Sequence, residues 1–259
     1  MVWTMESNGT ISQWRANDET DILFPETQLQ LGDILKLRGG APVCAPNFGT
    51  APTDNRYRHA HLPKHGLVRL SRIENGEVIQ GNPAIHQTLP ALDEEGWITA
   101  GFYYTHPWPF DVWVSARSTS CDKDNVQHLE HRITLGTELI HDCDIPYSIG
   151  FHPYFATAGK TFSLHYGNRR WNTEDLDVDE PFYVPCRDED KCFLIRTAHG
   201  NIEIELKCGY DGFYVWTDKP DKYICVEPVC VGYKPISHLI LPAGGMADCK
   251  CTLRYTQTS

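Results

Sequence analysis

The sequence contains no long apolar run, and its start has no basic region followed by an apolar one. No hydrophobic stretch approaches the roughly 20 residues that a membrane-spanning helix needs. The first seven residues, 1–7, therefore do not have the pattern of a secretory signal. We expect a cytoplasmic protein that does not bind membranes.

Several familiar binding motifs are also missing. The chain has no Gly-x-x-x-x-Gly-Lys-Ser/Thr loop, no Gly-x-Gly-x-x-Gly turn and no Gly-x-Ser-x-Gly elbow. The acidic run 174–180 resembles part of a calcium loop, but it lacks the required glycine and has Cys186 at the position of the closing glutamate. The histidines at 59, 61 and 65 have no carboxylate or cysteine nearby at a metal-ligand spacing. We therefore expect no metal and no cofactor.

Positive charge is scarce. The chain has 23 basic and 34 acidic residues, which gives a formal net charge of −11. Such a field repels nucleic acid, so we expect no nucleic-acid partner. It also repels phosphorylated metabolites unless a few arginines gather at the binding site.

The ten cysteines include no Cys-x-x-Cys pair. Disulfide frameworks are typical of short secreted chains without a sizeable core, whereas this chain has 259 residues. Cys249 and Cys251 lie in an alternating run that places both thiols on the same side as Leu253 and Tyr255. We expect reduced cysteines that pack as small hydrophobic side chains.

Short alternating segments separated by turn residues dominate the chain. Residues 201–208 alternate polar and apolar side chains, as in a half-buried strand, and 213–217 are rich in aromatic and β-branched residues. Further strands are expected at 112–116, 133–135, 223–226 and 236–241. The 20 glycines and 17 prolines interrupt nearly every ten residues. We predict an all-β protein, a large antiparallel sandwich with few short helices, formed by residues 1–259 as one monomeric domain.

Four segments combine unusual backbone with reactive side chains. Arg38 precedes Gly-Gly-Ala-Pro, where glycines and prolines make a sharply turning segment. His65 and Arg69 flank a turn and the start of a strand. His152 lies among aromatic residues before a proline, which favours extended backbone. Glu227 ends an apolar strand before another proline. Taken singly, each has a structural explanation: a core histidine, a solvated strand end or a surface ion pair.

Together these segments resemble the aldose 1-epimerase (galactose mutarotase-like) superfamily, over residues from about 22 to 255. The first two segments are most similar to its glucose-6-phosphate 1-epimerase branch. The resemblance implies a large β-sandwich with a cleft on one sheet, His152 and Glu227 as catalytic residues, and Arg38, His65 and Arg69 as substrate-binding residues. The substrate-binding aspartate corresponds to Asp179, with Asp177 as the alternative.

The chemistry of anomer interconversion suits this set of residues. Opening a pyranose requires removal of the C1 hydroxyl proton and protonation of the ring oxygen, for which a glutamate base and a histidine acid on opposite sides of the C1–O5 unit suffice. We predict a hexose-6-phosphate epimerase in which Arg38 and Arg69 bind phosphate. The alternatives are an epimerase of unphosphorylated hexoses and a non-catalytic carbohydrate-binding protein. Trp108, Tyr154 and Trp216 are candidates for stacking on a sugar.

Overall fold

The computed structural model describes most of the chain. The described residues are 2–7, 9–31, 34–49, 72–74, 77–79, 85–104, 110–121, 126–137, 145–159, 161–178, 180–187, 189–230 and 239–258.

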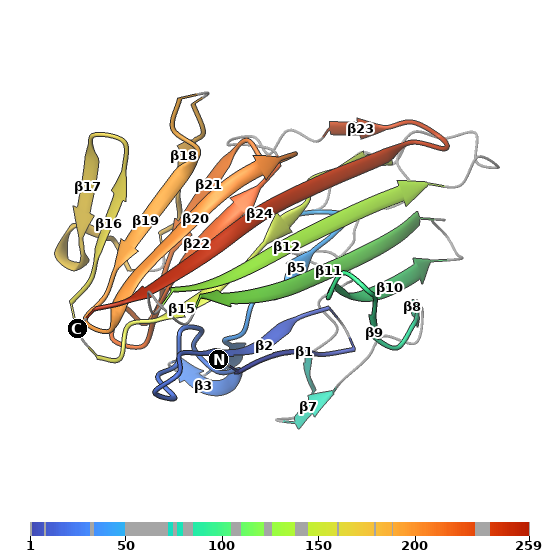
Figure 1. The fold of residues 1–259 in the computed structure, drawn as a ribbon. Helices are drawn as coiled ribbons and strands as arrows, with labels where there is room; N and C mark the ends of the chain where they lie inside the picture. Colours follow the sequence, from blue (N-terminus) through green and yellow to red (C-terminus); the bar gives the residue numbers. More distant parts are fainter. Residues whose placement is uncertain are drawn as a thin grey trace.

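Ten strands form the larger of the two main sheets (Figure 1). Its order is β17 (Arg169–Asn172), β16 (Ser163–Tyr166), β19 (Cys192–Arg196), β20 (Gly200–Cys208), β24 (Met246–Gln257), β12 (Val126–Thr137), β11 (Phe110–Cys121), β10 (Ile98–Tyr104) and β8 (Ile85–Gln87), with β9 (Ala91–Leu92) also paired to β10. Every neighbouring pair is antiparallel.

Six strands form the second main sheet, also antiparallel. Its order is β18 (Phe182–Pro185), β21 (Gly212–Trp216), β22 (Tyr223–Val229), β14 (Gly150–Phe151) and β5 (Val43–Cys44), and β15 (Tyr154–Ala156) also pairs with β22. Antiparallel pairs complete the described structure: β1 (Val2–Met5) with β2 (Ile11–Arg15), β3 (Thr27–Leu31) with β4 (Ile34–Arg38), β6 (Arg72–Glu74) with β7 (Glu77–Ile79), and β13 (Ile145–Tyr147) with β23 (Leu239–Leu241). A single 3₁₀ turn, η1 (Thr173–Asp175), is the one helical element among the described residues.

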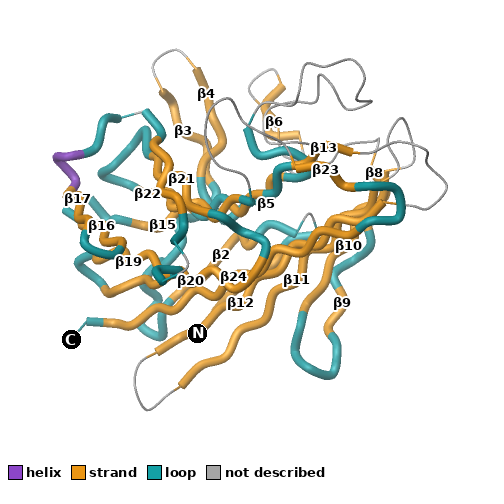
Figure 2. The backbone as a smooth tube through the Cα atoms, turned by 90° about the horizontal axis from the view of Figure 1, so that it is seen from above, coloured by secondary structure: helices purple, strands orange, loops and turns teal. Residues whose placement is uncertain are grey.

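The two main sheets pack face to face, as Figure 2 shows from above. One hydrophobic cluster includes residues of both sheets, among them Ile224 and Val226 from β22 and Leu129 and Ile133 from β12. Antiparallel sheets in a sandwich point alternate side chains into such a core. The predicted all-β antiparallel sandwich is confirmed.

Alternation in the sequence accounts for most of the long strands. In β24, Cys249, Cys251, Leu253 and Tyr255 are at most 2% exposed, while the residues between them are half-buried or exposed. The prediction that both thiols face the core with Leu253 and Tyr255 is confirmed. The predicted strands at 112–116 and 133–135 are much longer, since β11 and β12 each have 12 residues. The predicted strand at 236–241 is present as β23 from Leu239, and 236–238 lie outside the described residues.

Strand β22 is the exception to simple alternation, because all seven of its residues are buried. Ile224 and Val226 face the core between the sheets. Tyr223 and Cys225 belong to a separate cluster with Tyr154, on the opposite face of the same sheet. The six-stranded sheet is therefore covered on its outer face as well, and Glu227 lies on that face.

None of the helical structure within the described ranges is long and apolar enough to cross a membrane.

Candidate functional site

The register of the six-stranded sheet brings His152 and Glu227 together. Gly150 pairs with Val229, and Tyr154 pairs with Cys225, in the same antiparallel register. Counting inward from either pair places His152 opposite Glu227. Residues directly opposite each other on an antiparallel pair have Cβ atoms about 4.5–5.5 Å apart. The backbone therefore holds these two side chains next to each other on the outer face.

The two side chains are in direct contact. Nε2 of His152 lies 3.3 Å from Oε1 of Glu227, and the side chains are 5% and 4% exposed. We expected them on opposite sides of a sugar's C1–O5 unit, but their contact puts both on one side of any ligand. This arrangement still suits the opening of a sugar ring, because the two oxygens that exchange protons, O1 and O5, are both bonded to C1.

The Arg38-Gly39-Gly40 segment lies beside the strand that carries His152. The backbone N–H of His152 donates to the carbonyl oxygen of Pro42 (2.9 Å), and that of Tyr154 donates to Gly40 (2.9 Å). Gly39 has φ of 109°, and a Cβ atom there would lie 2.3 Å from the carbonyl oxygen of Pro25. Only glycine fits this turn, which directs the chain from β4 to the site.

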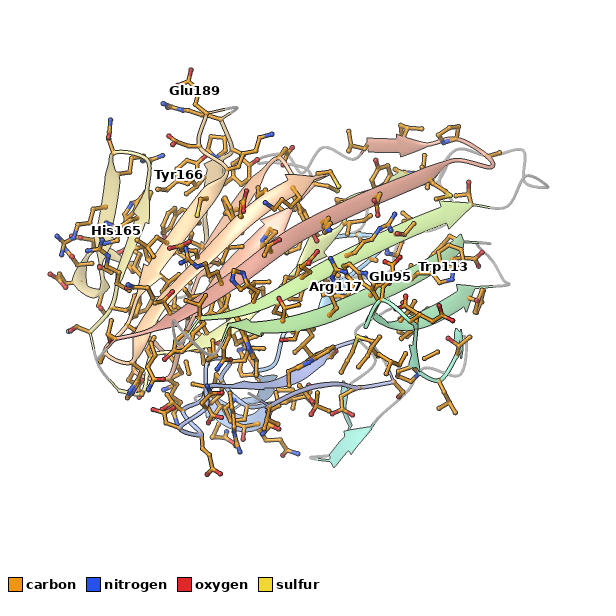
Figure 3. The ribbon with its side chains drawn as sticks, in the orientation of Figure 1. Glu95, Trp113, Arg117, His165, Tyr166 and Glu189 are labelled. Carbon is orange, nitrogen blue, oxygen red and sulfur yellow. The ribbon has the colours of Figure 1, made fainter. Side chains whose placement is uncertain are left out.

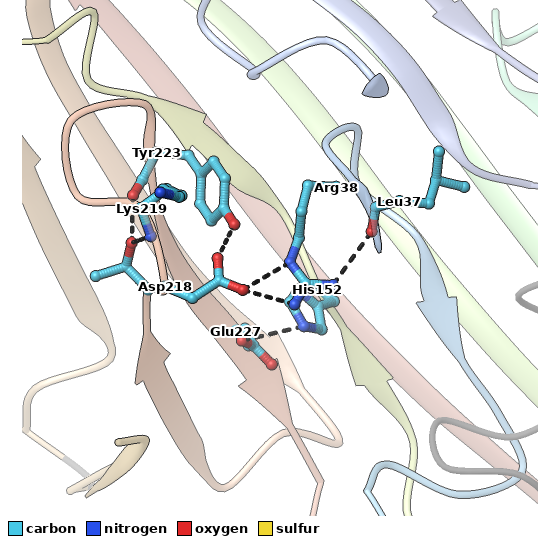
Figure 4. A network of polar contacts seen from close by, with 8 residues as sticks. Leu37, Arg38, His152, Asp218, Lys219, Tyr223 and Glu227 are labelled. Atoms are coloured by element: carbon cyan, nitrogen blue, oxygen red, sulfur yellow. Dashed lines mark hydrogen bonds and ion pairs between the residues drawn. The ribbon is translucent and has the colours of Figure 1, made fainter. Parts of the chain in front are cut away.

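Arg38 is held by an aspartate that the sequence did not indicate. Its Nη2 and Nε both donate to Oδ2 of Asp218, at 2.6 and 3.1 Å, as Figure 4 shows. The side chains are 11% and 7% exposed, and the hydroxyl of Tyr223 donates to Oδ1 of the same carboxylate. Burial lowers the pKa of Arg38, but the hydrogen bond and nearby negative charge of Asp218 outweigh it and raise that pKa. The guanidinium is thus permanently charged and already neutralised by a partner.

Aromatic rings surround the His152 imidazole. Tyr154 is stacked on it with centroids 4.8 Å apart and planes 11° apart, and Trp216 meets it edge-on at 6.1 Å. The guanidinium carbon of Arg38 lies 5.0 Å from the centroid of the Trp216 ring. Burial, then the hydrogen bond to Asp218, raise the pKa of Tyr223, so its phenol stays protonated. Tyr154 and Trp216, both expected near a sugar, are in this cluster.

Most of the remaining predicted site residues have no described position. His65, Arg69, Asp179 and Trp108 lie outside the described residues. Asp177, the alternative aspartate, is exposed, and its carbonyl oxygen accepts a hydrogen bond from the N–H of Glu180 (3.3 Å).

Sequence reasoning missed Asp218 and Cys225. Cys225 had a usable signal, because it lies two residues before Glu227 on a strand and so must share its face. Asp218 had none. It follows β21 in a run of turn residues, Asp218-Lys219-Pro220-Asp221, and its partner Arg38 is 180 positions away.

Comparison with solved structures identifies the fold. The chain is similar to the Slr1438 protein from Synechocystis sp. PCC 6803, with TM-score 0.66 and 16% identity over 99% of this chain and 91% of that one. It is similar to a galactose mutarotase related enzyme from Lactobacillus acidophilus, with TM-score 0.66 and 15% identity over 99% and 94%. It is also similar to a galactose 1-epimerase from L. acidophilus NCFM, with TM-score 0.55 and 9% identity over 99% and 94%.

The chain thus has the galactose mutarotase-like sandwich fold. No protein-family model matches the sequence, and no curated protein matches it. At these identities the likeness concerns the fold, so an argument about function has to come from the site.

Proposed function

We propose that the protein is an aldose 1-epimerase that interconverts the α and β anomers of a hexose. The observation that carries the proposal is the contact between the imidazole of His152 and the carboxylate of Glu227 on neighbouring strands. The aromatic surroundings and the Arg38–Asp218 pair support it, because sugars bind through ring stacking and through hydrogen bonds to hydroxyl groups. The names of structures with this fold, a galactose mutarotase related enzyme and a galactose 1-epimerase, agree with it.

The reaction needs only two proton transfers. Glu227 accepts the proton of the C1 hydroxyl, His152 donates a proton to the ring oxygen O5, and the C1–O5 bond breaks to give the open-chain aldehyde. Rotation about C1–C2 presents the other face of the carbonyl. The ring closes when O5 attacks C1, with His152 taking back the O5 proton and Glu227 returning its proton to O1. Protons balance over the cycle, and both residues return to their initial states.

The state of Arg38 favours an unphosphorylated sugar. Both guanidinium nitrogens that contact Asp218 are committed to that carboxylate, and the pair has no net charge. With the negative charge of Glu227 added, the described part of the site has no excess positive charge that would attract a phosphate dianion. A neutral pair is suited to hydroxyl groups, since the carboxylate accepts hydrogen bonds and the guanidinium donates them. Hexose 6-phosphate is the other substrate to be tested.

Polarimetry tests the proposal directly. Freshly dissolved α-glucose, α-galactose and α-glucose 6-phosphate are followed with and without the protein. We expect the protein to accelerate the approach to anomeric equilibrium, more strongly for a free hexose than for the phosphate ester. Saturable binding without acceleration would mean a carbohydrate-binding protein and would refute the proposal.

Glu227→Gln and His152→Asn assign the roles. Each is expected to lower kcat/KM by at least about 10²-fold, the lower end of what a positioned acid or base contributes. Glu203→Gln and His165→Asn are matched controls on the larger sheet, where His165 lies on β16 (Figure 3). The controls should retain activity. Circular dichroism checks that all four variants fold, and full activity in either site variant would contradict the assignment.

A further inference from the structure

A third potential metal ligand lies beside the acid–base pair. Cys225 and Glu227 alternate on β22, so both point to the outer face, and His152 lies opposite Glu227. One ligating atom of each residue can be chosen so that all three lie within 4.8 Å of one another. All three residues are buried, and among the described residues this is the one such group of three.

We propose that His152, Cys225 and Glu227 form a binding site for a thiophilic divalent cation, best matched by Zn²⁺, and that the bound cation blocks sugar turnover. Thiolate, imidazole and carboxylate are the three kinds of ligand that Zn²⁺ takes in proteins. Binding itself is independent of the proposed epimerase activity. The inhibition rests on that activity, because the cation occupies both the acid and the base.

The geometry requires only small side-chain adjustments. Zinc–ligand bonds of about 2.0–2.3 Å in a tetrahedron place neighbouring ligand atoms about 3.3–3.8 Å apart. His152 and Glu227 are already 3.3 Å apart, and the widest gap, up to 4.8 Å, closes by about 1 Å. Three protein ligands leave a fourth position for water.

Charge balance favours the cation in this buried place. Zinc binding replaces the Cys225 thiol proton and the proton that His152 carries as the acid, and both pass to the buffer as the S–Zn and N–Zn bonds form. The thiolate and the Glu227 carboxylate then offset the two positive charges, and His152 binds as a neutral imidazole. The occupied cluster has no net charge, which minimises the cost of burial. The stacked Tyr154 ring, 4.8 Å away, helps fix the orientation of the imidazole.

The outer face of the larger sheet provides a thiol for a control variant. A shallow groove there is lined by His128, Cys192, Glu203 and Glu205 among others. Cys192 is exposed, whereas Cys225 is buried. Cys192→Ser is the control for Cys225→Ser, because each variant replaces one thiol near a histidine and a glutamate.

Cobalt spectroscopy locates the site without relying on activity. Purified full-length protein, freed of metal with a chelator, is titrated with Co²⁺. We expect one equivalent to produce thiolate-to-cobalt charge-transfer absorption and the intense visible bands of a tetrahedral site. Both should persist in Cys192→Ser and disappear in Cys225→Ser. Absence of the thiolate band in the unmodified protein, or its loss in Cys192→Ser, would overturn the proposal.

Zinc affinity and X-ray absorption complete the test. Cys225→Ser should weaken Zn²⁺ binding at least about tenfold, since loss of even an outer-shell partner costs that much. X-ray absorption of the zinc-loaded unmodified protein needs no variant and should show one sulfur at about 2.3 Å with nitrogen or oxygen neighbours. No sulfur, or two or more, contradicts the assignment.

Inhibition is then measured on the unmodified protein and on Cys192→Ser. Zinc should abolish polarimetric activity at the concentration that fills the site. Activity that persists with the site filled would refute the blocking role alone. A protein that binds zinc as described but never accelerates mutarotation would refute the proposed function while leaving the cation site in place.

Discussion

His131 gives the sharpest prediction about stability. It lies on β12 inside the core between the sheets, it is 0% exposed, and its ring is stacked on Phe151 at 3.8 Å. Within the described structure, neither ring nitrogen has a hydrogen-bond partner. Burial lowers the pKa of His131 to about 3 from an ordinary value near 6.5. The folded protein therefore keeps this imidazole neutral over a pH range in which the unfolded chain protonates it.

The sign and size of the effect follow from proton linkage. Between pH 6.5 and pH 3 the unfolded state binds one more proton at this residue, so stability falls as the pH falls, by up to about 1.4 kcal/mol per pH unit. From pH 7.5 to pH 4.5 the loss attributable to His131 is about 2–3 kcal/mol. Above about pH 7.5 the residue adds almost no pH dependence. His131→Leu removes the titrating group, and replacing unpartnered buried nitrogens with carbon should also stabilise the protein by about 1–3 kcal/mol at neutral pH.

Urea unfolding at pH 7.5, 6.0, 5.0 and 4.5 measures the effect. The difference in unfolding free energy between His131→Leu and the unmodified protein should grow in favour of the variant as the pH falls. Carboxylates titrate in both proteins and cancel in this difference. His128→Gln, on the outer side of the same strand, is the control. A pH-independent difference for His131→Leu would refute the reasoning.

Two further predictions concern Arg38 and its turn. Gly39→Ala should lower the free energy of unfolding by about 2–4 kcal/mol, because positive φ and a clash with the Pro25 carbonyl act together. Gly96→Ala has positive φ of 82° but open space around it, so a smaller loss of about 1–2 kcal/mol is expected in the same urea titration. Equal losses would contradict the clash. Asp218→Asn removes the negative partner of Arg38, and it should raise kcat/KM for hexose 6-phosphate relative to free hexose by about tenfold, since a released guanidinium binds phosphate. An unchanged ratio in polarimetry would show that the pair does not select against phosphate.

The fold was largely predictable because apolar and polar residues alternate along its strands in step with their burial. The alternation in residues 201–208 and 249–255 reappears as strands β20 and β24, with the apolar side chains facing the core. Cys208 is the exception, since the strand register shifts after Leu206 and leaves it exposed. The lengths of β11 and β12 were not predictable in the same way. Residues 117–120 of β11 are all polar and show no alternation, and pairing with β12 along the whole length of the two strands makes them extended.

Two residues of the candidate site could be chosen from the sequence, but its geometry could not. His152 and Glu227 were chosen from the sequence, whereas their contact depends on a strand register across 75 positions, which local patterns do not encode. The Arg38–Asp218 pair depends in the same way on a tertiary contact between β4 and the turn after β21. Consequently the sequence suggested a phosphate ligand for Arg38, and the structure gives it a carboxylate.

The hairpin of β21 and β22 has a consequence for how substrate binding and proton transfer are connected. Asp218 lies in its turn, and Cys225 and Glu227 lie on its second strand, whereas Arg38 ends β4 and His152 lies between β14 and β15. A small shift of this one hairpin would change the Arg38–Asp218 distance and the His152–Glu227 distance at the same time. If the protein binds a sugar as proposed, hydroxyl groups bonded to Asp218 would therefore also adjust the spacing of His152 and Glu227, with no intermediate residue needed to transmit the movement.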